Sequence, residues 1–211
     1  PSRKLAALLG NARVLWPHTA IVETKSGGIG RGYAPTVEAG LAVASGDFLL
    51  LVNNDIMVFP SALRVMRDTF RVRRRVGAVV ARFLRLDGTL QEAGSAVFSD
   101  GSAVQFSNLW GSTNSLFRYT RPVDYGSAAC LMLRTELLAQ GFDRIFLPAY
   151  YEDTDLAMRI LHNSRFTVEY QPFAVVLHAG SATYGAPSEA KSMHMEKNKA
   201  AFRFRDTHDR Y

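Results

Sequence analysis

The chain has 211 residues, 47% of them hydrophobic, which fits one soluble globular domain spanning residues 1–211. No uninterrupted apolar stretch approaches the ~20 residues that cross a bilayer, which argues against a membrane-spanning helix in this sequence. The single cysteine, Cys130, excludes an internal disulfide and is expected to be a core thiol. The net charge is +6, from 25 Lys and Arg against 19 Asp and Glu.

Strand and helix patterns alternate along the chain. Segment 99–114, rich in Ser, Gly and Asn, is expected to be a long surface loop. Its aromatic residues Phe106 and Trp110 could stack on a ligand, although Trp110 could equally be packed. The alternation predicts an α/β fold around a mostly parallel sheet. Helices are expected over 33–44, 61–71, 154–162 and 189–204, and strands over 48–52, 76–81, 128–133 and 166–170.

A polar segment, Asn53-Asn54-Asp55, follows the apolar run 48–52. In open α/β sheets ligands collect at the carboxyl ends of strands, so Asp55 is placed to hold a divalent cation against a phosphate. The two asparagines could orient a ribose hydroxyl or a metal-bound water. A simple Asn-Asp turn explains the segment equally well.

A second short apolar run, 175–177, ends on His178. Most histidines in such positions are merely packed. A neutral imidazole at a strand end could also supply the nitrogen ligand that accompanies Asp55 around Mn²⁺ or Mg²⁺.

Three carboxylates occur within four residues of segment 150–156, where an aromatic loop meets a predicted helix. One interpretation is structural: the segment caps the helix, and its acids offset the positive end of the helix dipole. The other is chemical: Asp153, or alternatively Glu152, is a general base whose pKa is raised by burial and by neighbouring carboxylates. Arg159, one turn further on, is expected to pair with Asp155.

These segments, taken in order with several others, resemble the family-2 glycosyltransferases, nucleotide-sugar-dependent enzymes with the GT-A fold. Most of the chain takes part in the resemblance. The matching stretches are 28–32, 38–41, 44–47, 53–55, 87–94, 123–128, 141–143, 151–156, 171–172, 178 and 198–202.

The resemblance implies a GT-A-type α/β/α sandwich. It places Gly28 and Gly30 in the glycine-bearing loop near the nucleotide, and Asn53, Asn54 and Asp55 at the family's Asp-x-Asp motif. Asn53 replaces the first aspartate of that motif, so one negative charge is missing. Family members also begin with two strands that hold the base and ribose, whereas one strand candidate, 20–23, precedes the loop here. We therefore expect a chain truncated at its N-terminus.

The implied function is an inverting glycosyltransferase of the hexosyl- or deoxyhexosyltransferase class, acting in polysaccharide biosynthesis. Asp153 would be the general base, with Glu152 as the alternative, while Asp55 and His178 would hold Mn²⁺ or Mg²⁺. The expected partners are a nucleotide-sugar donor and a glycan or lipid-linked acceptor, and the expected location is the cytoplasm.

Two rival functions remain open. A dinucleotide-binding enzyme would explain the pair Gly28-x-Gly30, but its fingerprint needs a third glycine at position 33, which is Tyr33. A non-catalytic nucleotide- or glycan-binding module is the rival from another class, and an inactive truncated chain would behave as one.

The densest positive charge lies at Arg71, Arg73, Arg74 and Arg75. The structural interpretation is the solvated C-terminal turn of the preceding helix, where cations interact favourably with the helix dipole. The functional interpretation is a peripheral contact with anionic lipid headgroups at the membrane surface. Nucleic acid is not an expected partner, because no recognised binding motif accompanies the cluster.

Overall fold

The computed structural model describes residues 32–111, 113–163, 165–179 and 189–208, together with Ala20 and Val22. The expected strand at 20–23 and the glycine loop lie almost entirely outside these residues. No helix within the described residues is both long and apolar enough to cross a membrane.

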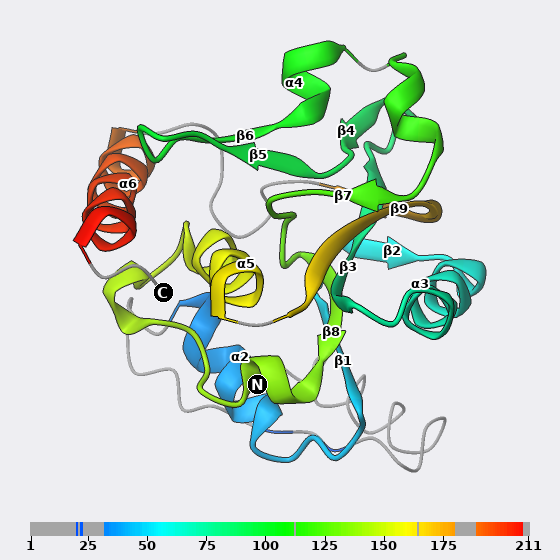
Figure 1. The fold of residues 1–211 in the computed structure, drawn as a ribbon, viewed down its shortest axis with the longest axis horizontal. Helices are drawn as coiled ribbons and strands as arrows, with labels where there is room; N and C mark the ends of the chain where they lie inside the picture. Colours follow the sequence, from blue (N-terminus) through cyan, green and yellow to red (C-terminus); the bar gives the residue numbers. More distant parts are fainter. Residues whose placement is uncertain are drawn as a thin grey trace, which may run out of the picture.

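A seven-stranded mixed sheet forms the centre of the described part (Figure 1). The strand order is β1-β8-β3-β9-β2, with β4 added to β3 and β7 added to β9. Strands β1, β3 and β9 run in one direction, and β8 runs in the opposite direction between β1 and β3. These strands are β1 (Phe48–Val52), β2 (Ile56–Val58), β3 (Val76–Leu84), β4 (Leu90–Glu92), β7 (Arg121–Pro122), β8 (Cys130–Arg134) and β9 (Thr167–His178).

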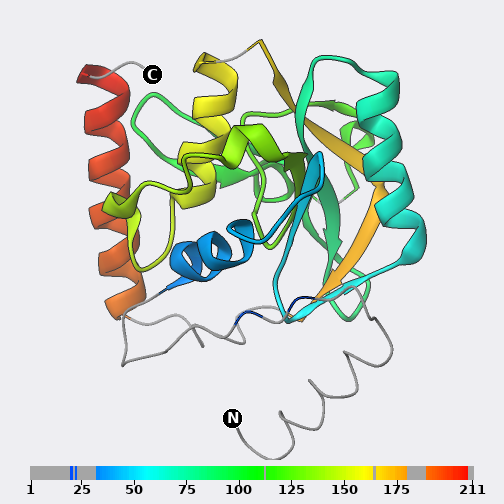
Figure 2. The ribbon, with the colours of Figure 1, turned by 90° about the horizontal axis from the view of Figure 1, so that it is seen from below.

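Helices cover both faces of this sheet, so the predicted α/β sandwich is confirmed. The sheet was expected to be mostly parallel and is mixed: among its described strands, β3 and β9 pair in parallel and the other pairs are antiparallel. Helix α3 lies on one side, whereas α2 and α5 lie on the other (Figure 1), and α6 lies beyond α5 at the edge away from α3 (Figure 2). The helices are α2 (Tyr33–Leu41), α3 (Pro60–Val72), α4 (Phe106–Trp110), α5 (Glu152–Asn163) and α6 (Glu189–His208), with single 3-10 turns at Ser115–Arg118, Thr135–Leu138 and Arg144–Phe146.

The sheet is buried on both faces because successive side chains of a strand point to opposite sides. In β8, Leu131 and Leu133 pack with the α2 and α5 side, whereas Cys130 and Met132 pack with the α3 side. Cys130 is fully buried, as predicted, and burial raises the pKa of its thiol to about 12. Full burial of a large apolar side chain contributes roughly 1.5–3 kcal/mol to the free energy of folding, relative to leaving it exposed.

Two expectations about elements were wrong. The strands expected at 166–170 and 175–178 form one strand, β9, which tolerates Pro172 because its register against β3 shifts between Val80 and Arg82. Segment 99–114 is not one loop: it contains β6 (Ala103–Gln105), which pairs with β5 (Ser95–Val97), and α4. The Phe106 ring packs against the core, with the Arg121 guanidinium 4.4 Å from its centroid.

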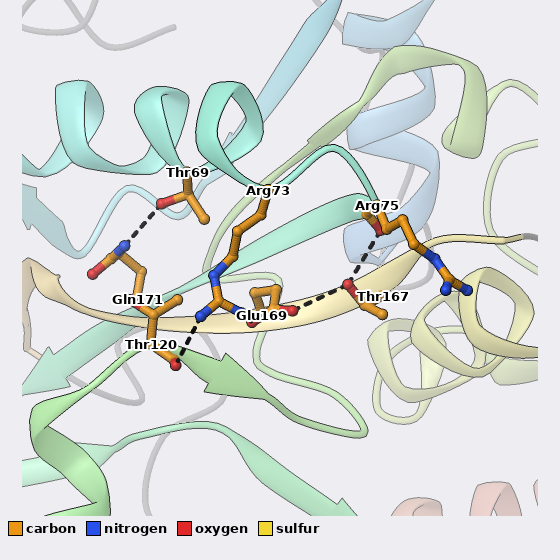
Figure 3. Close-up of polar contacts among 7 residues, drawn as sticks. All are labelled: Thr69, Arg73, Arg75, Thr120, Thr167, Glu169 and Gln171. Atoms are coloured by element: carbon orange, nitrogen blue, oxygen red, sulfur yellow. Dashed lines mark hydrogen bonds and ion pairs between the residues drawn. The ribbon is translucent and has the colours of Figure 1, made fainter.

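Two members of the basic cluster, Arg73 and Arg75, contact strand β9 (Figure 3). Arg73 forms an ion pair of 3.1 Å with the buried Glu169, and its Nη2 lies 3.5 Å from the Thr120 carbonyl. Arg75 donates from Nε to the Arg165 carbonyl, and its own carbonyl accepts from the Thr167 hydroxyl. These contacts join the end of α3 to β9, which favours the structural interpretation, and the membrane contact stays a prediction.

Candidate functional site

A cavity of about 370 Å³ opens where the end of β1, the end of β9, strand β4 and the start of α5 meet. Four of the predicted site residues line it: Asn53, Glu152, Asp153 and His178. Because these residues come from parts of the chain far apart in sequence, the fold itself brings them together.

The pair Asp55 and His178 is positioned by strand pairing. β2 runs antiparallel to the end of β9, with Ile56 opposite His178, and the Ala179 N–H donates to the Asp55 carbonyl over 3.0 Å. His178 Nε2 therefore lies 3.4 Å from Asp55 Oδ2, with the two side chains only 14% and 10% exposed. The centroids of the Phe83 ring and the His178 imidazole lie 5.8 Å apart, with the rings packed edge to face.

This pair fits a divalent cation in its donor chemistry. Asp55 Oδ1 is buried and accepts no hydrogen bond within the described residues, so this carboxyl oxygen lacks the partner that buried polar atoms usually have. Carboxylate oxygen suits Mg²⁺ and Mn²⁺, and imidazole nitrogen is a common ligand of divalent transition metals. The described residues contain no group of three or more His, Cys, Asp or Glu side chains arranged for a metal, so phosphate and water oxygens would complete the shell.

The two asparagines differ in position. Asn53 lines the cavity, and its backbone N–H donates to the Ala129 carbonyl over 2.9 Å, which ties the end of β1 to β8. Asn54 is exposed and lies outside the cavity lining. Gly28 and Gly30 lie outside the described residues, so their predicted place near the nucleotide stays a prediction.

The acidic segment begins helix α5 at Glu152. Asp153 Oδ1 accepts from the Thr154 N–H over 2.8 Å, and Oδ2 accepts from the Ala128 N–H over 3.3 Å. The carboxylate thus satisfies a donor of the first helical turn, as the structural interpretation expects, and also joins α5 to the loop before β8. Burial raises the pKa of Asp153, and the two backbone hydrogen bonds only partly oppose this.

Glu152 has fewer partners than Asp153. Its Oε2 is buried and accepts no hydrogen bond within the described residues. Burial, followed by the charge of Asp153, raises the pKa of Glu152. The third acid, Asp155, is fully buried and does not line the cavity. It forms an ion pair of 2.9 Å with Arg159, as predicted.

A further acid at the site, Glu92 on β4, was missed by the sequence analysis. It is 2% exposed and lines the cavity, where it accepts from the Ser127 N–H over 2.8 Å and from Gln105 Nε2 over 3.1 Å. Burial, with a smaller contribution from the charge of Asp153, raises its pKa to about 7. Its neighbours in the sequence, Gln91 and Ala93, give no local signal that this acid is buried.

Two residues of the loop before α5 adopt unfavourable backbone dihedral angles. Tyr150 and Tyr151 have φ angles of 77° and 73°, a region that bulky side chains rarely adopt. Asn198 Nδ2 on α6 lies 2.9–3.0 Å from three carbonyls of the segment before α5, so its two N–H groups are shared among them. The Tyr151 hydroxyl donates to the Gly101 carbonyl. Helix α6 therefore fixes the entry into the acidic segment, which positions Glu152 and Asp153.

Comparison with known proteins shows the fold. No family model and no curated protein matches the sequence. Among solved structures, GalNAc-T7 with UDP, GalNAc and Mn²⁺ matches 92% of this chain and 40% of its own, with a TM-score of 0.63 and 12% identity. The mannosyltransferase PcManGT from Pyrobaculum calidifontis, in complex with GDP-Man and Mn²⁺, matches 98% of this chain and 52% of its own, with a TM-score of 0.59 and 13% identity.

The chain therefore spans about half or less of the length of these two similar structures. At this level of identity the likeness establishes the architecture alone. The described part of the chain has a GT-A-type α/β fold.

Proposed function

We propose that this chain is the GT-A domain of an inverting glycosyltransferase, which moves a hexosyl or deoxyhexosyl group from a nucleotide-diphosphate donor to a hydroxyl of a glycan or lipid-linked acceptor. The observation that carries the proposal is that His178, which contacts Asp55, and Asp153 border the same cavity. The similar structures are complexes with UDP, or GDP-Man, and Mn²⁺, which supports a nucleotide-sugar donor and a divalent cation.

Asp55 and His178 would hold the cation, which supplies positive charge to the diphosphate. Asp153 takes the proton of the acceptor hydroxyl while that oxygen bonds to the anomeric carbon and the bond from this carbon to the diphosphate oxygen breaks. Attack from the face opposite the leaving group inverts the anomeric configuration.

The protonation state of Asp153 follows from its surroundings. Because burial raises its pKa, the carboxylate holds a proton more strongly than an exposed aspartate does, which suits a general base working closer to neutral pH. Transfer should therefore increase as the pH rises through this pKa. Glu152 is the alternative base, supported by its buried Oε2 without a hydrogen bond.

The test compares single-turnover sugar transfer with donor affinity in Asp153→Asn and Glu152→Gln. Asp153→Asn should lower transfer by ~10²-fold or more, the cost of a lost general base, while donor affinity stays close to that of the wild type. The matched control is Glu136→Gln, which makes the same carboxyl-to-amide exchange at an exposed position. Thermal unfolding of each variant checks that it is folded.

Loss of transfer in Glu152→Gln alone would assign the base to Glu152 and refute the role of Asp153. A wild-type protein that binds the donor and transfers sugar to no acceptor would instead support the non-catalytic binding module.

A further inference from the structure

Gln91 on β4 contacts the ring nitrogen of His178 that faces away from Asp55. Its amide Nε2 lies 3.0 Å from His178 Nδ1, while His178 Nε2 lies 3.4 Å from Asp55 Oδ2. The register explains this: β4 pairs with β3 at Leu84 and Leu90, and Leu84 pairs with Leu177 of β9. The imidazole therefore lies between an amide on one side and a carboxylate on the other.

This arrangement couples the tautomer of a neutral His178 to the orientation of the Gln91 amide. When the Gln91 amide nitrogen donates to Nδ1, that nitrogen is the acceptor and the ring proton is on Nε2. Nε2 then donates toward Asp55 Oδ2, and it has no lone pair for a cation. Two buried oxygens, Gln91 Oε1 and Asp55 Oδ1, accept no hydrogen bond within the described residues.

Metal binding requires the other tautomer. A metal-ligating histidine donates its second ring N–H to an outer acceptor, which sets the ring orientation and raises the basicity of the ligating nitrogen. If the Gln91 amide rotates by about 180°, Gln91 Oε1 takes the place of Gln91 Nε2. Gln91 Oε1 then accepts a hydrogen bond from His178 Nδ1–H. The amide oxygen and the amide nitrogen are nearly the same size, so the other heavy atoms can stay in place while the ring proton passes from His178 Nε2 to Nδ1.

We propose that Gln91 is a reversible positioning residue for His178: it donates to Nδ1 in the metal-free protein and, after its amide turns, accepts from Nδ1–H when Nε2 binds a divalent cation. The inference rests on the proposed function, because it uses the Asp55 and His178 cation site. Glutamine suits this position because its amide contains both a donor and an acceptor, whereas glutamate offers acceptors and methionine lacks both strong groups.

The first measurement is the tautomer of His178 in protein with ¹⁵N-labelled histidine. Two-bond ¹H–¹⁵N spectra at a pH where the ring is neutral show which nitrogen holds the proton, and His178→Ala assigns the signal among the five histidines. We expect the proton on Nε2 in the metal-free protein and on Nδ1 after addition of Mg²⁺ with UDP or GDP. A proton on the same nitrogen in both states would overturn the inference.

The second measurement is Mn²⁺ affinity, followed by the electron paramagnetic resonance signal of free Mn²⁺, with and without UDP or GDP. Gln91→Met should weaken Mn²⁺ binding by about 10- to 100-fold, the usual cost of losing an outer partner of a metal ligand. Gln91→Glu should preserve the affinity, because its carboxylate accepts from Nδ1–H. Gln140→Met, at an exposed position, is the matched control.

The outcomes separate this inference from the proposed function. If the wild type binds Mn²⁺ and transfers sugar, but Gln91→Met binds Mn²⁺ equally well, the role of Gln91 is refuted and the glycosyltransferase proposal stands. If the wild type binds no Mn²⁺ in either condition, the cation site of the proposed function fails together with the inference.

Discussion

Replacing Glu92 with glutamine should make the stability of the protein less dependent on pH. Glu92 is 2% exposed, and its pKa rises from an ordinary value of 4.5 to about 7, chiefly because of burial. Between these pH values the unfolded chain releases the Glu92 proton first, so rising pH favours unfolding. A pKa shift of one unit corresponds to ~1.4 kcal/mol. Ionisation of Glu92 should therefore lower the unfolding free energy of the wild type by about 3 kcal/mol over this pH range.

Glutamine at position 92 cannot ionise, and its amide oxygen can still accept from the Ser127 N–H. The unfolding free energy of Glu92→Gln, minus that of the wild type, should therefore increase by about 3 kcal/mol from pH 4.5 to above pH 7. Urea unfolding across this range measures the difference, with Glu136→Gln as the matched control at an exposed position. A difference that does not change with pH would refute the reasoning.

Three further predictions concern binding and packing. Asp55→Ala should weaken Mn²⁺-dependent binding of UDP or GDP in calorimetric titrations, and equal metal-dependent affinity would contradict the cation site. Asn198→Ala should lower the unfolding free energy by about 1–3 kcal/mol, because buried carbonyls before α5 lose their donor; an unchanged urea midpoint would contradict this role. Gly126→Ala should lower the unfolding free energy by about 1–3 kcal/mol in the same assay, because the new Cβ would clash with Val80. Gly40→Ala, which has open space around it, should raise the unfolding free energy by up to ~1 kcal/mol. Equal effects of the two substitutions would contradict the packing around Gly126.

The local patterns predict the central elements of the fold well. The apolar runs at β1 and β8 and the helix starts near Pro60 and Glu152 follow from hydrophobic spacing and capping chemistry. The patterns fail where long-range pairing decides the structure. β9 continues through Pro172 because β3 pairs with it on both sides of a bulge. The three-residue strands β5 and β6 are too short to give a periodic signal.

The same limit applies to the candidate site. Asp55, Asp153 and His178 were predictable as candidates because each lies at the end of an element, where ligands collect in α/β folds. Their roles stay predictions. Glu92 was not predictable, because its significance comes from burial beside α5, and Gln91 is significant only through its contact with a histidine 87 positions away. Such contacts depend on tertiary packing and leave no local pattern.

The most direct measurement of the central claim is the anomeric configuration of a transferred sugar. The wild-type protein would be incubated with Mn²⁺, UDP- and GDP-sugars and a panel of glycan and lipid-linked acceptors, and the product analysed by NMR. We predict a product whose anomeric configuration is opposite to that of the donor, formed by the wild type and nearly abolished in Asp153→Asn. Retention of the donor configuration, or donor binding without transfer to any acceptor, would contradict an inverting glycosyltransferase.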